Sequence, residues 1–283
     1  MRISVIIPVY NSESTIAEAI ESVLNQDYSC LELIVVDGNS SDKTLEVVNK
    51  YIKHISILIS ENDDGYADAF NKGIKVSTGD FILMLSADDH LLPNAIRKFL
   101  NTVSSNTDVW CGSVILKMPY GYLVRKSNSD LNQLLNHCSL ENAATFYRKE
   151  VFKDFGYFDT KYICANDREM FLRLYLNNAS FQIESTPITL FSMGGLSTAD
   201  PGKFAIPEDT LISIKYGVDK SNFDKNTKRV KLTLIYQKII MPFKILLAKF
   251  GMISVFYCMF GKKDIFLSEK HLLSMGVPRE WLK

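Results

Sequence analysis

The chain is poor in the residue types that mark several common protein classes. Its 283 residues include only two tryptophans, four histidines and five cysteines. The cysteines are scattered and odd in number, and no Cys-x-x-Cys pair or His/Cys cluster suggests zinc, so we expect reduced thiols in a cytosolic compartment. The 32 basic residues are balanced by 32 acidic ones, which argues against nucleic-acid binding driven by bulk charge.

Two absences near the N-terminus exclude further classes. The segment after the first apolar run, residues 8–15, contains no glycine. A Rossmann dehydrogenase would carry a G-x-G-x-x-G motif there, which excludes that class. A sugar nucleotidyltransferase would carry a glycine-rich loop for its triphosphate, so it stays only an alternative. The chain opens on an apolar run rather than on a basic segment before one, so we expect no signal peptide.

Apolar runs and helix-period patterns alternate over the first hundred residues. Continuous apolar runs of this length are typical of strands buried on both faces, and they cover residues 3–9, 31–36, 55–59 and 81–85. Amphipathic helix patterns separate them, with short connections. The alternation predicts an α/β fold with a mostly parallel sheet flanked by helices.

The alternation weakens after residue 109. We expect a hairpin over 109–125, a short strand over 143–147 and a helix over 166–178. A final strand pair is expected at 181–183 and 188–191. Residues 194–228 are rich in Gly, Ser, Pro, Asp and Lys and indicate a loop or linker.

The C-terminal part of the chain differs in charge from the rest. Residues 220–283 hold 13 Lys/Arg and 4 Asp/Glu, whereas residues 1–219 hold 19 and 28. Lys231, Lys238 and Lys249 have the spacing of one helical face in a strongly apolar stretch. No 18-residue run is free of charge, so a basic amphipathic helical tail at a membrane surface is favoured over a spanning helix. A helix pair packed on the core or across a dimer is the alternative.

Polar residues follow several of the predicted strands at the point where each strand ends. Tyr10 and Asn11 follow the first, Asp37 the second, and residues 86–89 the fourth. In open α/β sheets, ligands bind beyond the carboxyl ends of the strands. We therefore expect these residues to share one edge of the sheet.

Four motifs stand in a distinctive order: IIPVYN at 6–11, VVDGNSSD at 35–42, Asp88-Asp89 after a strand, and ANDRE at 165–169. Together they resemble the family-2 inverting glycosyltransferases with a GT-A (Rossmann-like) fold, and most closely the branch that builds bacterial O-antigen and capsule polysaccharides. The stretch 60–89 carries the most specific likeness, which extends over roughly residues 1–195. The resemblance implies a catalytic domain over 1–220, followed by the tail at 221–283.

The resemblance also implies the partners. A hexose-type sugar would pass from a nucleotide-diphosphate donor, with UDP favoured, to a hydroxyl of a lipid-linked oligosaccharide. The enzyme would lie in the cytoplasm, peripheral on the inner face of the bacterial plasma membrane.

We expect a metal site in the residues that directly follow the fourth predicted strand. A divalent cation held by carboxylates neutralises the charge of a departing diphosphate, and oxygen ligands favour Mg²⁺ or Mn²⁺. The family's metal motif is usually Asp-x-Asp, and here Ser86 stands at its first position. Asp88 is therefore the main candidate ligand and Asp89 the weaker one. A structural acidic turn is the alternative, and a catalytically silent nucleotide-sugar-binding subunit is the alternative function that Ser86 keeps open.

The remaining candidate residues follow from the family's donor-binding positions. The donor-binding candidates are Pro8, Tyr10, Asn11, Asp37, Asp68, Asn71, Lys72 and Asp88. Asp37 is expected to accept a hydrogen bond from the base or the ribose, and Lys72 to meet the diphosphate as a point charge. The alternatives are an Asx turn at Asp37 and a solvated helix lysine at Lys72.

Asp167 matches the family position of the catalytic base. Inversion in one displacement needs a single base to take the proton of the attacking hydroxyl. We expect the helix N-terminus to keep Asp167 ionised. A plain helix-capping role is the alternative. Arg168 and Glu169 are weaker candidates, because charged residues on a helix face usually contact water.

Overall fold

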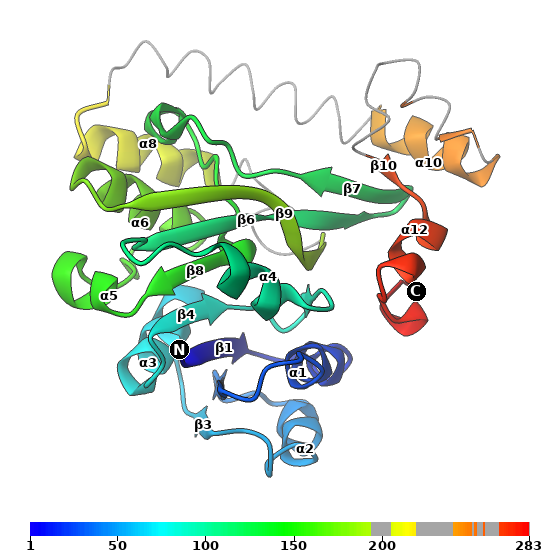
Figure 1. Cartoon of the computed structure of the whole chain (residues 1–283), viewed down its shortest axis with the longest axis horizontal. Helices are drawn as coiled ribbons and strands as arrows, with labels where there is room; N and C mark the ends of the chain where they lie inside the picture. Colours follow the sequence, from blue (N-terminus) through cyan, green and yellow to red (C-terminus); the bar gives the residue numbers. More distant parts are fainter. Residues whose placement is uncertain (194–204, 219–239, 251, 254–256, 258–265, 283) are drawn as a thin grey trace.

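The computed structural model describes residues 1–193, 205–218, 240–250, 252–253, 257 and 266–282, which form a twisted sheet with helices on both faces (Figure 1). Its strands are β1 (Ile3–Val9), β2 (Leu31–Asp37), β3 (Ile57–Ser60), β4 (Phe81–Met84), β5 (His90–Leu91), β6 (Val109–Met118), β7 (Gly121–Arg125), β8 (Thr145–Arg148), β9 (Phe181–Ser192) and β10 (Phe266–Leu267). Its α-helices are α1 (Ile16–Leu24), α2 (Thr44–Asn49), α3 (Tyr66–Val76), α4 (Ala95–Thr102), α5 (Glu150–Phe155), α6 (Asn166–Leu176), α8 (Ala205–Lys215), α10 (Met241–Lys249) and α12 (Glu269–Ser274). Short 3₁₀ helices lie at η1 (Leu131–Leu135), η2 (Asn142–Ala144) and η6 (Arg279–Leu282).

The N-terminal strands form a parallel set within a mixed sheet. β1 lies between β2 and β4 and is parallel to both, and β3 extends the parallel set beyond β2. β8 then pairs antiparallel with β4 and β6, and the β6–β7 hairpin continues the sheet. Among the described strands, five pairings are antiparallel and four are parallel. The α/β fold is confirmed, but the sheet is mixed rather than mostly parallel.

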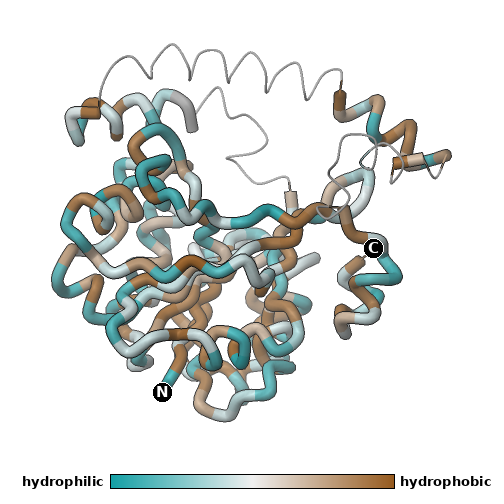
Figure 2. The backbone as a smooth tube through the Cα atoms, turned by 45° about the horizontal axis from the view of Figure 1, so that its top comes forward, coloured by the Kyte–Doolittle hydropathy of each residue, from teal (hydrophilic) through white to brown (hydrophobic). Residues whose placement is uncertain are grey.

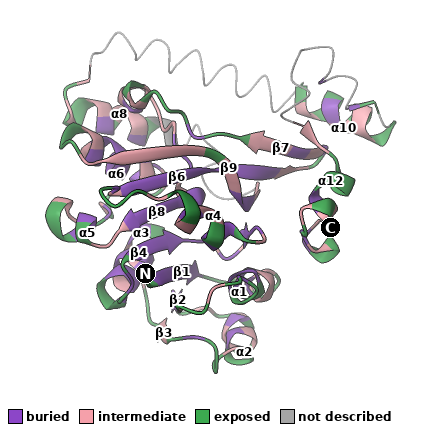
Figure 3. Cartoon of the chain, in the orientation of Figure 1, coloured by how far each residue is buried: buried purple, intermediate pink, exposed green. Residues whose placement is uncertain are grey.

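Alternate residues of the central strands supply two separate cores, one on each face of the sheet. In β1, Val5 and Ile7 pack with helices α1 and α4, while Ile6 packs with α3 and α6. All seven residues of β1 are buried, as Figure 3 shows for the strands in the middle of the molecule, and Figure 2 shows that the chain there is largely hydrophobic. Burying each such side chain stabilises the fold by roughly 1.5–3 kcal/mol, which explains why this run folds as a central strand.

The second half of the chain departs from the sequence prediction in two places. The expected strand pair at 181–183 and 188–191 is one strand, β9, which runs parallel to β6 along 12 residues. Register shifts in the β6–β9 pairing around Ser113 accommodate the polar residues in the middle of β9. The expected loop at 194–228 contains helix α8, while residues 194–204 and 219–228 lie outside the described residues.

Part of the predicted tail is built into the folded domain. β10 pairs with β7, and Leu272, Val277 and Trp281 join a core cluster with residues of β6 and β9. Trp281 is 3% exposed and stacks on His90 with the ring centroids 4.8 Å apart. No helix within the described residues is long and apolar enough to cross a membrane. Lys231 and Lys238 lie outside the described residues.

Candidate active site

The carboxyl ends of the parallel strands form one edge of the sheet. Tyr10 follows β1 there and is 62% exposed. Asn11 beside it has a left-handed backbone (φ 46°), which asparagine tolerates. Its side-chain oxygen accepts the Ser41 N–H at 2.8 Å, and its own N–H donates to Ser40 Oγ at 2.9 Å. The β1 and β2 loops are thereby tied together beside the exposed Tyr10 ring.

Two donor-binding candidates lie inside the edge rather than on it. Asp37 is fully buried, and its carboxylate accepts the Ser60 hydroxyl at 2.7 Å and the Ser40 N–H at 3.2 Å. Pro8 is a buried residue of β1 opposite Val36. In this structure both hold the loops in place and neither offers an open surface to a ligand.

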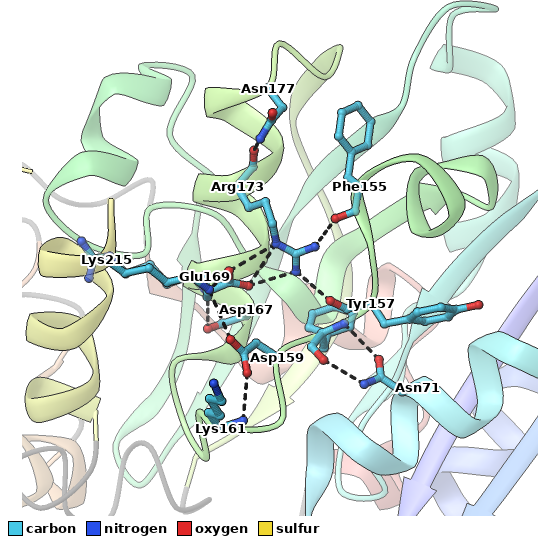
Figure 4. Close-up of polar contacts among 12 residues, drawn as sticks. Asn71, Phe155, Tyr157, Asp159, Lys161, Asp167, Glu169, Arg173, Asn177 and Lys215 are labelled. Carbon is cyan, nitrogen blue, oxygen red and sulfur yellow. Dashed lines mark hydrogen bonds and ion pairs between the residues drawn. The ribbon is translucent and has the colours of Figure 1, made fainter. Parts of the chain in front are cut away.

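The three candidates on α3 have protein partners. Asn71 is 6% exposed, and its amide donates to the Phe158 carbonyl at 2.9 Å and accepts the Phe158 N–H at 3.0 Å (Figure 4). The Lys72 ammonium donates to the Asn62 carbonyl and pairs with Glu61 at 3.0 Å and Asp68 at 3.2 Å. Asn71 therefore anchors a neighbouring loop, and Lys72 holds the acidic loop at 61–65.

In the acidic pair that follows β4, Asp89 is buried and Asp88 is half-buried. Asp89 is fully buried; its Oδ1 accepts the Ser192 N–H at 2.9 Å, but its Oδ2 has no hydrogen-bond partner among the described residues. The Ser192 hydroxyl donates to the Asp88 carbonyl at 2.6 Å. Burial raises the pKa of Asp88, and burial together with the Asp88 charge raises the pKa of Asp89 well above its usual value. The Arg125 charge offsets only part of this rise at Asp89.

Tyr66 connects this pair to the proposed base. It is the first residue of α3, and its hydroxyl lies 2.7 Å from Ser86 Oγ. Burial and then the charges of Asp89, Asp88 and Asp167 raise the pKa of Tyr66, so all three carboxylates act on one hydroxyl. Sequence reasoning missed Tyr66; its place at the start of a helix that follows an acidic rim loop was the available signal.

Asp167 lies in the first turn of α6, as predicted. Its Oδ1 accepts the Arg168 N–H at 2.6 Å, and its Oδ2 accepts the Cys138 thiol at 3.7 Å. Burial raises the pKa of Asp167 to about 6, and the Asp209 and Glu141 charges add to the effect. Desolvation therefore outweighs the helix dipole in setting this pKa, although Asp167 is still ionised at neutral pH, as expected.

The expectation that Arg168 and Glu169 contact water is also wrong, since both are fully buried. The Arg168 guanidinium donates to the Asp209 carbonyl at 2.6 Å and the Leu135 carbonyl at 3.1 Å. Glu169 accepts hydrogen bonds from Arg173, Lys215 and Tyr216, part of which Figure 4 shows. These residues fasten α6 to its neighbours.

Glu141 and Arg125 complete the electrostatics of the site. Glu141 is 9% exposed and pairs with the Arg125 guanidinium at 2.5 Å. Burial nevertheless raises the pKa of Glu141. Four carboxyl groups with raised pKa values therefore act on the same region, which favours binding of a cation.

The residues that follow β4 in the sequence supply only part of the ligands that a hard divalent cation needs. Asp88 and the unpartnered Oδ2 of Asp89 supply oxygen atoms. No three His, Cys, Asp or Glu side chains form a metal-binding group within the described part of the chain. Mg²⁺ in enzymes is commonly held by one or two carboxylates together with substrate phosphates and water. The site therefore fits Mg²⁺ or Mn²⁺ in company with a diphosphate.

Comparison with known proteins shows the family to which the chain belongs. Residues 4–171 match the sequence model of glycosyl transferase family 2, a range that contains every candidate site residue. An uncharacterized glycosyltransferase of Haemophilus influenzae is 37% identical over 107 residues, which are 37% of this chain and 43% of the relative. A PGL/p-HBAD biosynthesis glycosyltransferase of Mycobacterium bovis is 28% identical over 62% of this chain and 70% of its own length. The chain thus covers less than half of the Haemophilus relative.

Solved structures share the fold at lower identity. Staphylococcus aureus TarS 1–349 in complex with UDP-GlcNAc has a TM-score of 0.59 at 19% identity, covering 93% of this chain and 89% of TarS. The mannosyltransferase PcManGT from Pyrobaculum calidifontis, in complex with GDP-Man and Mn²⁺, has a TM-score of 0.59 at 17% identity, covering 99% and 81%. Because the family's sequence model covers more than half of its residues, this chain belongs to glycosyl transferase family 2.

Proposed function

We propose that the protein is an inverting glycosyltransferase that moves a hexose-type sugar from a nucleotide-diphosphate donor, with UDP favoured, to a hydroxyl of a saccharide acceptor. The observation that carries the proposal is the match of residues 4–171 to the sequence model of glycosyl transferase family 2, within which Asp88 follows the buried strand β4 and Asp167 lies in the first turn of α6. Asp88 and Asp89 suit the leaving diphosphate, and Asp167 suits the attacking hydroxyl.

Asp167 is the proposed base. The acceptor hydroxyl attacks the anomeric carbon from the side opposite the diphosphate, its proton passes to the Asp167 carboxylate, and the bond to the diphosphate breaks. One displacement inverts the anomeric centre and needs no covalent intermediate. With its pKa raised to about 6, Asp167 is ionised at neutral pH and is a stronger base than an ordinary aspartate.

The donor is proposed to lie along the sheet edge. The exposed Tyr10 ring offers a stacking surface for the base, and Asn11 holds the adjoining loop. Asp88, with Asp89 behind it, would hold Mg²⁺ or Mn²⁺, which neutralises the charge of the departing diphosphate. Asp37, Asp68, Asn71, Lys72 and Pro8 are proposed to shape the donor site through the loops that they hold. The bound UDP-GlcNAc of TarS and the GDP-Man and Mn²⁺ of PcManGT support a nucleotide-sugar donor.

The proposed acceptor is a lipid-linked oligosaccharide of O-antigen or capsule synthesis at the inner face of the bacterial plasma membrane. Support comes from α10, where Ile240, Leu246, Phe250 and Met252 are 37–69% exposed. Lys244 points inward and donates to the Tyr257 hydroxyl at 2.8 Å, so this apolar surface faces away from the domain. With 13 basic residues in 220–283, the tail suits an anionic lipid surface.

Flotation with anionic vesicles tests the membrane contact. Wild type is expected to float and the double variant Leu246→Ser/Phe250→Ser to stay in solution. Leu211→Ser/Ile214→Ser is the matched control, because these α8 residues are 56% and 60% exposed but lie outside the tail. Equal flotation of the tail variant and wild type would exclude the proposed surface.

Thermal-shift titration with UDP, GDP, CDP and ADP, each with and without Mn²⁺, tests the donor site. A ligand at about 100 times its dissociation constant stabilises the folded state by roughly 2.7 kcal/mol. We expect a shift with UDP that Mn²⁺ enlarges and that Asp88→Ala removes. No shift with any nucleotide would contradict the proposal, and binding without turnover on any acceptor would favour a silent binding subunit.

A further inference from the structure

Helix α8 packs beside α6, the helix that carries Asp167 in its first turn (Figure 1). α8 lies beyond residue 171, where the match to the family's sequence model ends. Its contacts with α6 are polar and buried: Asp209 and Ser213 accept hydrogen bonds from the Arg168 guanidinium, and Lys215 donates to Glu169. The helix is therefore fastened to the residues that directly follow Asp167.

The N-terminus of α6 lacks a capping side chain of its own. Ala165 occupies the N-cap position and makes no side-chain capping bond. Amide groups at a helix start need acceptors from elsewhere in the protein. Glu208 of α8 instead holds the segment that enters the helix: its carboxylate accepts the N–H groups of Ile163 and Cys164, which precede α6, and of Ala165 at the N-cap, each at 2.8 Å.

These bonds hold the chain that leads into the first turn of α6, where Asp167 lies. Glu208 is 8% exposed, and three charge-assisted bonds fix three consecutive residues that end two positions before Asp167. The Asp167 carboxylate itself accepts hydrogen bonds from the Arg168 N–H and from the Cys138 thiol. Its position depends also on the backbone at 163–165, which leads into the helix that carries it.

We propose that Glu208 is a positioning residue, which sets the position of the Asp167 carboxylate for the attacking hydroxyl. The proposal rests on the proposed function, in which Asp167 is the base. A displacement of about 1 Å at a reacting group can cost roughly 100-fold in rate. We therefore expect Glu208→Ala to lower kcat by up to about 100-fold and to leave the donor KM unchanged, because the donor contacts lie across the site.

A double-mutant cycle tests the proposal with the full chain and a UDP-sugar, measuring UDP release. Glu208→Ala is made in wild type and in Asp167→Asn, with Leu211→Ala as the control on the exposed side of the same helix. If Glu208 acts through Asp167, its removal costs much in wild type and less than about twofold in Asp167→Asn. An equal fractional loss in both backgrounds would show a merely structural role and overturn the proposal.

Two measurements keep the outcomes distinct. Glu208→Gln retains the side-chain length and one acceptor oxygen, so it replaces Glu208→Ala in the cycle if the alanine variant does not fold. It is expected to lie between wild type and Glu208→Ala in kcat; a kcat at the wild-type level would count against the need for the carboxylate. Failure of the proposed function is seen separately, as an Asp167→Asn rate equal to that of wild type.

Discussion

Replacing Asp167 by asparagine should make the protein more stable while it removes the proposed base. The pKa of this carboxyl rises from 3.8 to about 6 on folding, chiefly because it is buried. At about 1.4 kcal/mol per pH unit, the ionised carboxylate costs the folded state at most about 3 kcal/mol, and partial exposure reduces this to about 2 kcal/mol. Asp167→Asn removes that cost and keeps an acceptor oxygen for the Arg168 N–H.

The sign of the pH dependence follows from linkage. The folded state holds the Asp167 proton more tightly than the unfolded state, so wild type loses stability as the pH rises from 3.8 through about 6. The advantage of Asp167→Asn should therefore be about 2 kcal/mol at pH 8 and vanish near pH 4. Urea unfolding at both pH values measures it. An advantage that is absent at pH 8, or equal at both pH values, would refute the reasoning.

Asp159→Asn is the matched control with the opposite sign. Burial tends to raise the pKa of Asp159, but the Lys161 N–H, at 3.1 Å, and the Lys215 ammonium, at 3.2 Å, lower it overall. Its ionised form therefore stabilises the folded state above the unfolded pKa. Asp159→Asn should lower stability at pH 8, which separates the effect of burial from that of removing any carboxylate.

Three further predictions follow. The kcat of wild type should fall as the pH drops through about 6. Asp209→Asn should move this fall to lower pH, because the Asp209 charge helps to raise the pKa of Asp167. A pH profile that does not move would argue against Asp167 as the titrating group. Gly73→Ala should cost about 1–3 kcal/mol in urea unfolding, because its Cβ would lie 2.5 Å from Ile6 Cγ2; unchanged stability would show that the α3–β1 contact can relax. Trp281→Ala should lower stability by about 3 kcal/mol, measured in the same way, and a loss below 1 kcal/mol would contradict the docking of the C-terminal segment on the sheet.

The N-terminal half of the fold could be predicted because its signals are local. The predicted strand at 3–9 agrees with β1 residue for residue, since a β-branched run buried on both faces has few other solutions. The reversal at β8 and the docking of residues 266–282 could not be predicted, because both depend on pairing between segments far apart in the chain.

The candidate site shows the same difference between local sequence signals and contacts from distant parts of the chain. Asp88 and Asp167 belong to recognisable local motifs, and the charges of both raise the pKa of Tyr66. The partners of Asn71 and Arg168 lie 87 and 41 residues away, so no local pattern could show that these side chains are used inside the protein. Glu208 falls in a stretch whose composition indicated a loop, and its role is visible only once α8 lies beside α6.

The most direct test of the central claim needs no knowledge of the acceptor. Purified wild type is incubated with an α-linked UDP-sugar and Mn²⁺, with water as acceptor, and the first anomer of the released sugar is recorded by proton NMR. The account predicts that the β-anomer appears first, and that Asp167→Asn slows release at least about 100-fold while it still binds UDP. First release of the α-anomer, or an Asp167→Asn rate equal to that of wild type, would contradict it.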